Sequence, residues 1–175
     1  MSLSPDKTIK SIEVALNNES RERDFYLMHS KRTTNSMGKL MFTTLAQDEI
    51  EHYQRLLKLH ETLSAQGAWP ETVPLTVKGS NLQNVLKELL NTVEIASPAD
   101  VDDHAAVKIA IDFEQKAYLF YSSLKNAVGN QQEKKFFTML ADMELEHYHS
   151  LKDTLLYFED PSGWFLMKEK TNVDG

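Results

Sequence analysis

Two copies of the motif Glu-x-x-His, 95 residues apart, are the most chemically informative feature of this chain. The first copy holds Glu49 and His52, and the second holds Glu144 and His147. The surrounding segments read FTTLAQDEIEHY and FTMLADMELEHY, and eight of their twelve positions are identical. A carboxylate and an imidazole three residues apart lie on one face of a helix, where both can bind the same metal ion. The repeat therefore predicts metal chemistry in both halves of the chain.

Each motif is preceded by a further glutamate at the same distance. Glu19 lies 30 residues before Glu49, and Glu114 lies 30 residues before Glu144. The two halves together supply four carboxylates and two imidazoles. Two divalent metal ions bring four positive charges, which four carboxylates balance inside an apolar core, and two neutral imidazoles complete the ligand set. The six residues therefore predict a two-metal site. Mixed oxygen and nitrogen ligands suit iron, with manganese or zinc as alternatives.

The structural alternative is a decayed duplication that binds no metal. A single Glu-x-x-His arises by chance and carries little weight, but here the motif occurs twice with matched upstream glutamates. Without metal ions, four buried carboxylates would repel one another and would have to take up protons to stay inside. A purely structural core has little reason to hold them.

Three further side chains are candidates for supporting roles. Tyr26 and Tyr121 each follow the upstream glutamate of their half by two helical turns. They either donate hydrogen bonds to ligand carboxylates or serve as core aromatics. Glu22 lies on the same helical face, three residues after the first upstream glutamate, and is a candidate seventh ligand. Its counterpart is Ala117, so this role would be confined to one half. The histidines without a matched partner are expected to be structural or surface residues: His29, His60, His104 and His149.

Four long helices are needed to position the predicted ligands. Ser4-Pro5-Asp6 is typical of a helix start, and Asn35 to Gly38 is typical of a tight stop. Apolar residues recur around the upstream glutamates at spacings of three and four, which places these glutamates on the core face. We expect three helices over about 4–34, 39–65 and 97–129, and a fourth helix that continues from there to about 158.

The lengths predict an all-α, up-down four-helix bundle made of two repeated hairpins. Helices of about 26 residues span roughly 40 Å. Two hairpins can pack ligand to ligand only if the connection between them returns along the bundle, and apolar residues between Leu82 and Val93 predict a short helix within that crossover. Trp164 to Met167 either cap the bundle or contact a partner subunit. We expect one domain over 1–175, with repeats at about 6–65 and 99–158, a crossover at 66–98 and a tail at 159–175.

Composition excludes several other classes of protein. With 175 residues, 41% of them hydrophobic, the chain can form one packed core. A net charge of −7 without a basic stripe argues against nucleic acid as a partner. The absence of cysteine excludes disulfides and iron–sulfur clusters within these residues. No apolar run approaches the ~20 residues that span a membrane, and the N-terminus lacks signal-peptide features. We therefore expect a cytoplasmic protein without membrane contact.

The motifs resemble the rubrerythrin branch of the ferritin-like superfamily over about residues 6–158. The resemblance rests on the Glu-x-x-His repeats and on the segments from Glu19 to Tyr26 and from Glu114 to Tyr121. It implies a ferritin-like bundle with two non-haem iron ions per chain and a reaction in which hydrogen peroxide is reduced or Fe(II) is oxidised. The ligands that it implies are Glu19, Glu49, His52, Glu114, Glu144 and His147.

Two departures from the rubrerythrin pattern, and one difference from the similar bacterioferritins, shape the expected partners and cofactors. Full-length rubrerythrins carry a cysteine-ligated rubredoxin domain that supplies electrons, and this chain has no cysteine, so we expect an external electron-transfer protein. Rubrerythrins also carry an extra glutamate where this chain has Ala117. Bacterioferritins bind haem through a methionine directly after the second-helix glutamate, where this chain has Ile50; we expect no haem.

Three classes of function follow from these observations. The leading one is a di-iron oxidoreductase that reduces peroxide or dioxygen, with Glu49 and Glu144 as bridging ligands and one histidine per metal. The second is a ferroxidase that stores or delivers iron in a shell of many subunits. The third is a structural or interaction module that zinc would stabilise as well as iron. In each case a homo-oligomer, a dimer or larger, is expected.

Overall fold

A computed structural model of the chain describes residues 5–67, 69, 99 and 101–173. These residues form α1 (Pro5–Arg32), α2 (Ser36–Gln66), α4 (Val101–Ala127), α5 (Gln131–Glu159) and α6 (Pro161–Val173). The described residues contain no strand, so the predicted all-α class is confirmed. None of these helices combines the length and the hydrophobicity that crossing a membrane requires.

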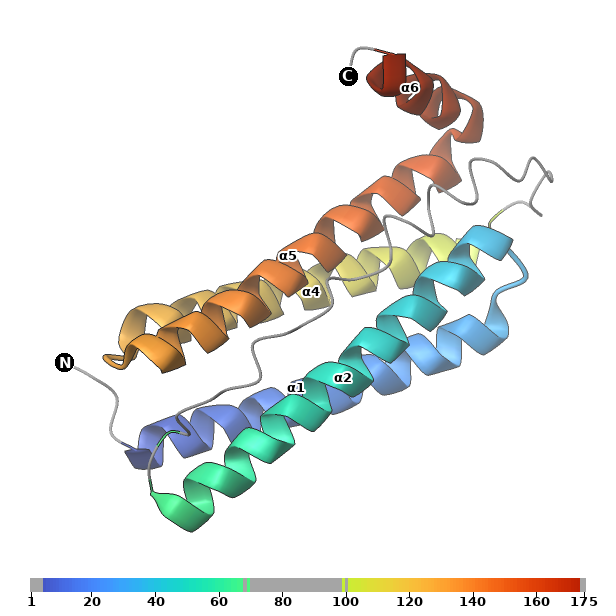
Figure 1. Cartoon of the computed structure of the whole chain (residues 1–175). Coiled ribbons are helices and arrows are strands. Elements are labelled where there is room, and N and C mark those ends of the chain that lie inside the picture. The colour runs from blue at the N-terminus through green and yellow to red at the C-terminus, as the bar shows by residue number, and fades with distance from the viewer. Residues whose placement is uncertain (1–4, 68, 70–98, 100, 174–175) are drawn as a thin grey trace.

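The first four of these helices form two antiparallel hairpins that lie side by side (Figure 1). α1 pairs with α2 and α4 pairs with α5, while α1 also contacts α4 and α2 contacts α5. α2 and α4 run in the same direction, so the end of α2 and the start of α4 lie at opposite ends of the bundle. The predicted four-helix bundle of two hairpins is therefore confirmed. The short helix predicted between Leu82 and Val93 lies outside the described residues.

The turn between α1 and α2 differs from the sequence prediction. The side-chain oxygen of Asn35 accepts a hydrogen bond of 2.9 Å from the backbone N–H of Gly38, which makes Asn35 the N-cap of α2. The helix therefore begins at Ser36 rather than near Lys39, and reading Gly38 as a stop was wrong. The glycine has a packing role instead, because a Cβ at this position would lie 3.1 Å from Cζ of Phe158 on α5.

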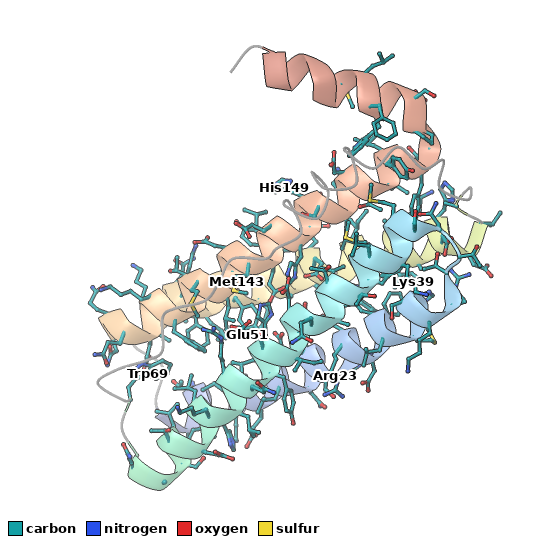
Figure 2. The ribbon with its side chains drawn as sticks, turned by 45° about the vertical axis from the view of Figure 1, so that its right-hand side comes forward. Arg23, Lys39, Glu51, Trp69, Met143 and His149 are labelled. Carbon is teal, nitrogen blue, oxygen red and sulfur yellow. The ribbon has the colours of Figure 1, made fainter. Side chains whose placement is uncertain are left out.

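A layer of buried acids and histidines divides the apolar core into two clusters. One cluster lies toward the α1–α2 turn and includes Phe42 and Phe158. The other lies toward the α4–α5 turn and includes Phe136 and Phe137, against which Trp69 packs (Figure 2). Residues related by the repeat occupy opposite clusters, as Phe42 and Phe137 do. The sequence repeat is thus a pseudo-twofold relation whose centre is the polar layer.

The tail forms α6, which packs against the end of α5 (Figure 1). Trp164 is 2% exposed and meets Tyr157 of α5 edge to face, with ring centroids 5.3 Å apart. The indole thereby joins the cluster at the α1–α2 turn. Phe165, Leu166 and Met167 are exposed. Trp164 thus makes a capping contact within the chain, while contact of this segment with a partner subunit stays a prediction.

An ion pair joins α1 to α4 at the same end. Arg32 pairs with Asp103, whose side chain is fully buried. We expect Arg32→Ala to lower the free energy of unfolding by about 1–3 kcal/mol, because it leaves a buried carboxylate without its cationic partner. Arg23→Ala is the control, since Arg23 pairs with the exposed Asp24 and should cost less than about 1 kcal/mol. Urea denaturation measures both; equal losses would contradict the expectation.

Candidate metal centre

Six buried side chains converge at the middle of the bundle, between the two apolar clusters. Each of the four long helices contributes to them, and all six side chains are 0% exposed. These are the six predicted ligands, and the structure brings all of them together: Glu19 from α1, Glu49 and His52 from α2, Glu114 from α4, and Glu144 and His147 from α5.

The six side chains form two overlapping groups of four. In each group, one ligand atom from every residue lies within 4.8 Å of the others, a spacing that could hold one metal ion. Two glutamates, Glu49 and Glu144, belong to both groups. Glu19 and His52 complete one group; Glu114 and His147 complete the other, and their assignment as ligands stays a prediction. The arrangement has room for two metal positions that share two carboxylates.

Both imidazoles turn the same nitrogen toward the carboxylates. Nδ1 of His52 lies 3.1 Å from Oε2 of Glu19 and 3.1 Å from Oε2 of Glu49. Nδ1 of His147 lies 3.3 Å from Oε1 of Glu49 and 3.5 Å from Oε2 of Glu144. The rings stack with centroids 5.6 Å apart. Nδ1 is therefore the atom through which either histidine could bind a metal ion.

The two tyrosines orient glutamates of the opposite hairpin. The hydroxyl of Tyr26 on α1 donates to Oε1 of Glu114 on α4, and the hydroxyl of Tyr121 on α4 donates to Oε1 of Glu19 on α1. Burial, and then the charges of these glutamates, raise the pKa of both hydroxyls well above the usual value. The tyrosines therefore keep their protons and remain hydrogen-bond donors at neutral pH.

Asp48 is a functional candidate that the sequence analysis missed. Its Oδ2 lies 3.1 Å from Nε2 of His147, the ring nitrogen that faces away from the carboxylates. A carboxylate in this place fixes the tautomer and the orientation of a metal-binding histidine. The available signal was its position directly before Glu49. The repeat places Met143 at the corresponding position of the second half. Because Asp48 is not repeated there, the sequence alone did not mark it as part of the site.

Glu22 lies beside the six residues without belonging to either group of four. Its side chain is buried, and its Oε2 has no hydrogen-bond partner among the described residues. It lines a pocket of about 340 Å³ between α1 and α4, opposite Ala117. Burial, followed by the charges of Glu114, Glu49 and Glu19, raises the pKa of Glu22 well above its usual value. The carboxyl group thus lies between the pocket and the buried cluster.

Burial and mutual repulsion raise the pKa of the shared carboxyl groups, which favours their protonated form. Burial and the charge of Glu19 raise the pKa of Glu49 well above its usual value, and burial and the charge of Glu49 do the same for Glu144. Burial alone would also raise the pKa of Glu19, but the hydrogen bond and the charge of His52 outweigh it and lower that pKa. In the metal-free protein the shared carboxyl groups are therefore shifted toward their protonated form.

Nearby carboxylates raise the pKa of both histidines, which favours the binding of protons to their rings. Burial alone would lower the pKa of His147, but the charge of Glu114 and the hydrogen bond to Asp48 raise it well above its usual value. The pKa of His52 is also raised, because the charge of Glu144 and the bond to Glu19 outweigh burial. A metal ion entering the cluster would displace these protons.

Several buried acceptor atoms lack a donor, and this fits a bound cation. Buried polar atoms are nearly always hydrogen-bonded in folded proteins, so unpartnered ones require an explanation. Four carboxylate oxygens and one inward-facing ring nitrogen of the cluster have no hydrogen-bond partner among the described residues: Glu49 Oε1, Glu114 Oε2, Glu144 Oε1 and Oε2, and His147 Nδ1. Four carboxylates with two imidazoles suit iron or manganese. The other four histidines belong to neither group.

Comparison with known proteins found a matching family model. A family model described as Rubrerythrin matches residues 10–155, a span that holds all six side chains of the cluster. The comparisons with curated proteins and with solved structures returned no match.

Proposed function

Because the chain belongs to the rubrerythrin family, we propose that its buried cluster binds two iron ions and that the protein is a non-haem di-iron oxidoreductase. Its substrate would be hydrogen peroxide or dioxygen. The observation that carries the proposal is the pair of four-atom groups that share Glu49 and Glu144. Such sharing suits two metal ions held close together, whereas a single structural ion needs only one group.

The residues supply what a redox-active iron pair needs. Four carboxylates balance the charge of two Fe(II) ions, and Glu49 and Glu144 are the proposed bridging ligands, with one histidine per metal. Bound there, two Fe(II) ions would supply the two electrons that, with two protons, convert hydrogen peroxide into two water molecules. The apolar clusters on either side exclude bulk water from the cluster. Tyr26 and Tyr121 hold two of the carboxylates in place.

The pocket beside Glu22 is the proposed approach for the oxidant. Peroxide and dioxygen are small compared with its volume of about 340 Å³. The wall formed by Phe113, Ala117 and Phe120 is apolar, and the carboxyl group of Glu22 is the buried polar group among its lining residues. Since the pKa of Glu22 is raised by burial, its Oε2 can hold a proton between the pocket and the cluster. It is also the proposed seventh ligand.

The electron donor is proposed to be a separate electron-transfer protein. The 175 residues contain no cysteine, so no cysteine-ligated iron centre can form within them. Each turnover of peroxide would consume two electrons, which the donor would have to restore.

An anaerobic Fe(II) titration followed by stopped-flow mixing with oxidant tests the proposal. We expect saturation at two Fe(II) per chain, oxidation within seconds and a faster reaction with peroxide than with dioxygen. Absence of stoichiometric binding would contradict the di-iron centre. Binding without oxidation by either oxidant would contradict the oxidoreductase and favour a structural metal site.

The same titration distinguishes the ferroxidase alternative. A storage or delivery protein would prefer dioxygen and would continue to take up iron beyond two per chain. It would also assemble into a hollow shell of many subunits, which size-exclusion chromatography separates from the smaller homo-oligomer that we propose.

A further inference from the structure

The two histidines of the centre differ in what their outer nitrogens contact. Nε2 of His147 lies 3.1 Å from Oδ2 of Asp48. Nε2 of His52 is also buried, but it has no hydrogen-bond partner within the described part of the chain. Both rings turn Nδ1 inward toward carboxylates, and their outer nitrogens differ in having or lacking a carboxylate partner among the described residues.

The internal repeat identifies the residue responsible for this difference. Asp48 precedes Glu49 by one residue, and the residue that precedes Glu144 is Met143, labelled on α5 in Figure 2. Met143 is buried, and its thioether is at best a weak acceptor. Each half supplies two of the four glutamates and one of the two histidines. The carboxylate that contacts the outer nitrogen of a histidine occurs at this position in the first half alone.

A carboxylate on the outer nitrogen strengthens a metal-binding histidine. By accepting the Nε2 proton, it fixes the tautomer that leaves the Nδ1 lone pair free, and it raises the basicity of that nitrogen. Losing such a partner typically costs 10–100-fold in metal affinity. The imidazole of His147 has this support, and among the described residues the imidazole of His52 has no such partner.

We propose that the two metal positions are unequal and that the position beside His147 binds its metal ion more tightly because Asp48 orients and polarises that imidazole. The first metal ion therefore occupies the group that contains Glu114 and His147. The second enters the group that contains Glu19 and His52. This inference rests on the proposed two-metal centre and adds an order of binding to it.

Titration of the whole metal-free chain with Co(II) tests the order. Co(II) is stable toward air and reports its surroundings by visible absorption, while calorimetry measures the two affinities. We expect two steps of one Co(II) per chain, with the first at least about tenfold tighter. Two positions that share carboxylates can also separate because the bound cations repel each other. The comparison of variants therefore decides the question.

Two substitutions act on opposite positions. Asp48→Asn keeps the shape of the side chain but removes its charge, and should weaken the first step by about 10–100-fold while leaving the second nearly unchanged. Met143→Asp gives His52 a carboxylate partner and should strengthen the second step, so that the two steps merge. Met143→Leu is the matched control and should reproduce the wild-type isotherm. Circular dichroism of the metal-free variants verifies that they fold.

The outcomes separate this inference from the proposed centre. Equal weakening of both steps by Asp48→Asn, or no weakening, would overturn the assignment of Asp48 to one position. Folded Met143→Asp with an unchanged second step would overturn it as well. If Met143→Asp does not fold, Asp48→Asn still decides. A wild-type chain that binds no Co(II) would contradict the two-metal centre itself.

Discussion

Replacing Glu49 or Glu144 with glutamine is expected to abolish binding of both metal ions, because each side chain belongs to both four-atom groups. Glutamine keeps the size of the side chain and removes its charge. Affinity at each position should fall at least about 100-fold, more than the loss of an outer partner causes. Elemental analysis after anaerobic loading with Fe(II) should then fall from two metal ions per chain to well below one.

The same substitution at the unshared glutamates is the control. Glu19 and Glu114 belong to one group each, so Glu19→Gln or Glu114→Gln should leave about one metal ion per chain. If either unshared substitution removed both ions, the division of the cluster into two groups with shared carboxylates would be wrong. If Glu49→Gln still bound two ions with wild-type affinity, Glu49 would not be a ligand.

The second expectation is that the metal-free protein loses stability as the pH rises. The pKa values of Glu22, Glu49 and Glu144 are raised in the folded state, by burial first and then by neighbouring carboxylates. The folded state therefore binds more protons than the unfolded state. This contribution to stability is complete below the unfolded carboxyl pKa of about 4.3 and is lost as the pH rises through the folded values.

The other titratable groups of the cluster do not reverse this loss of stability in the neutral pH range. The raised pKa values of His52 and His147 add stability that is likewise lost as the pH rises above the usual histidine range. The lowered pKa of Glu19 acts the other way, but its contribution changes only at acid pH, below the usual carboxyl value. Between about pH 5 and 8 the metal-free protein should therefore become steadily less stable.

Thermal unfolding of the metal-free protein measures this effect. We expect the Tm to fall by at least about 4 °C across the range, the change that 1–2 kcal/mol produces in a chain of this size. Metal loading should raise the Tm, by mass action on the folded state. Metal-free Glu144→Gln should be more stable than the metal-free wild type at pH 8, because one repelling carboxylate is gone. A flat pH profile, or a less stable Glu144→Gln, would contradict the account.

Helix-local features of the protein were predictable from the sequence. Glu49 and His52 share a face because residues three apart do so in any α-helix. The repeat has the same spacing at Glu144 and His147, so the same prediction applies there. The long uninterrupted segments likewise predicted the hairpins. The error at Gly38 arose because a glycine ends a helix in one context and allows close packing in another. Phe158, which decides between these roles, lies 120 residues away in the chain.

The sequence by itself determined the six candidate ligands and the four long helices, because both follow from spacing along single helices and that spacing recurs in the two halves. Tertiary structure alone decided which side chains meet across helices. In the folded chain, the hydroxyl of Tyr26 donates a hydrogen bond to Glu114 rather than to the glutamate of its own helix. Asp48 contacts His147, which lies on the opposite hairpin. Such contacts depend on the rotation and register of packed helices, which no spacing within one segment encodes. For that reason the six residues of the candidate centre could be predicted from the sequence, while the contact that distinguishes its two halves required the folded chain.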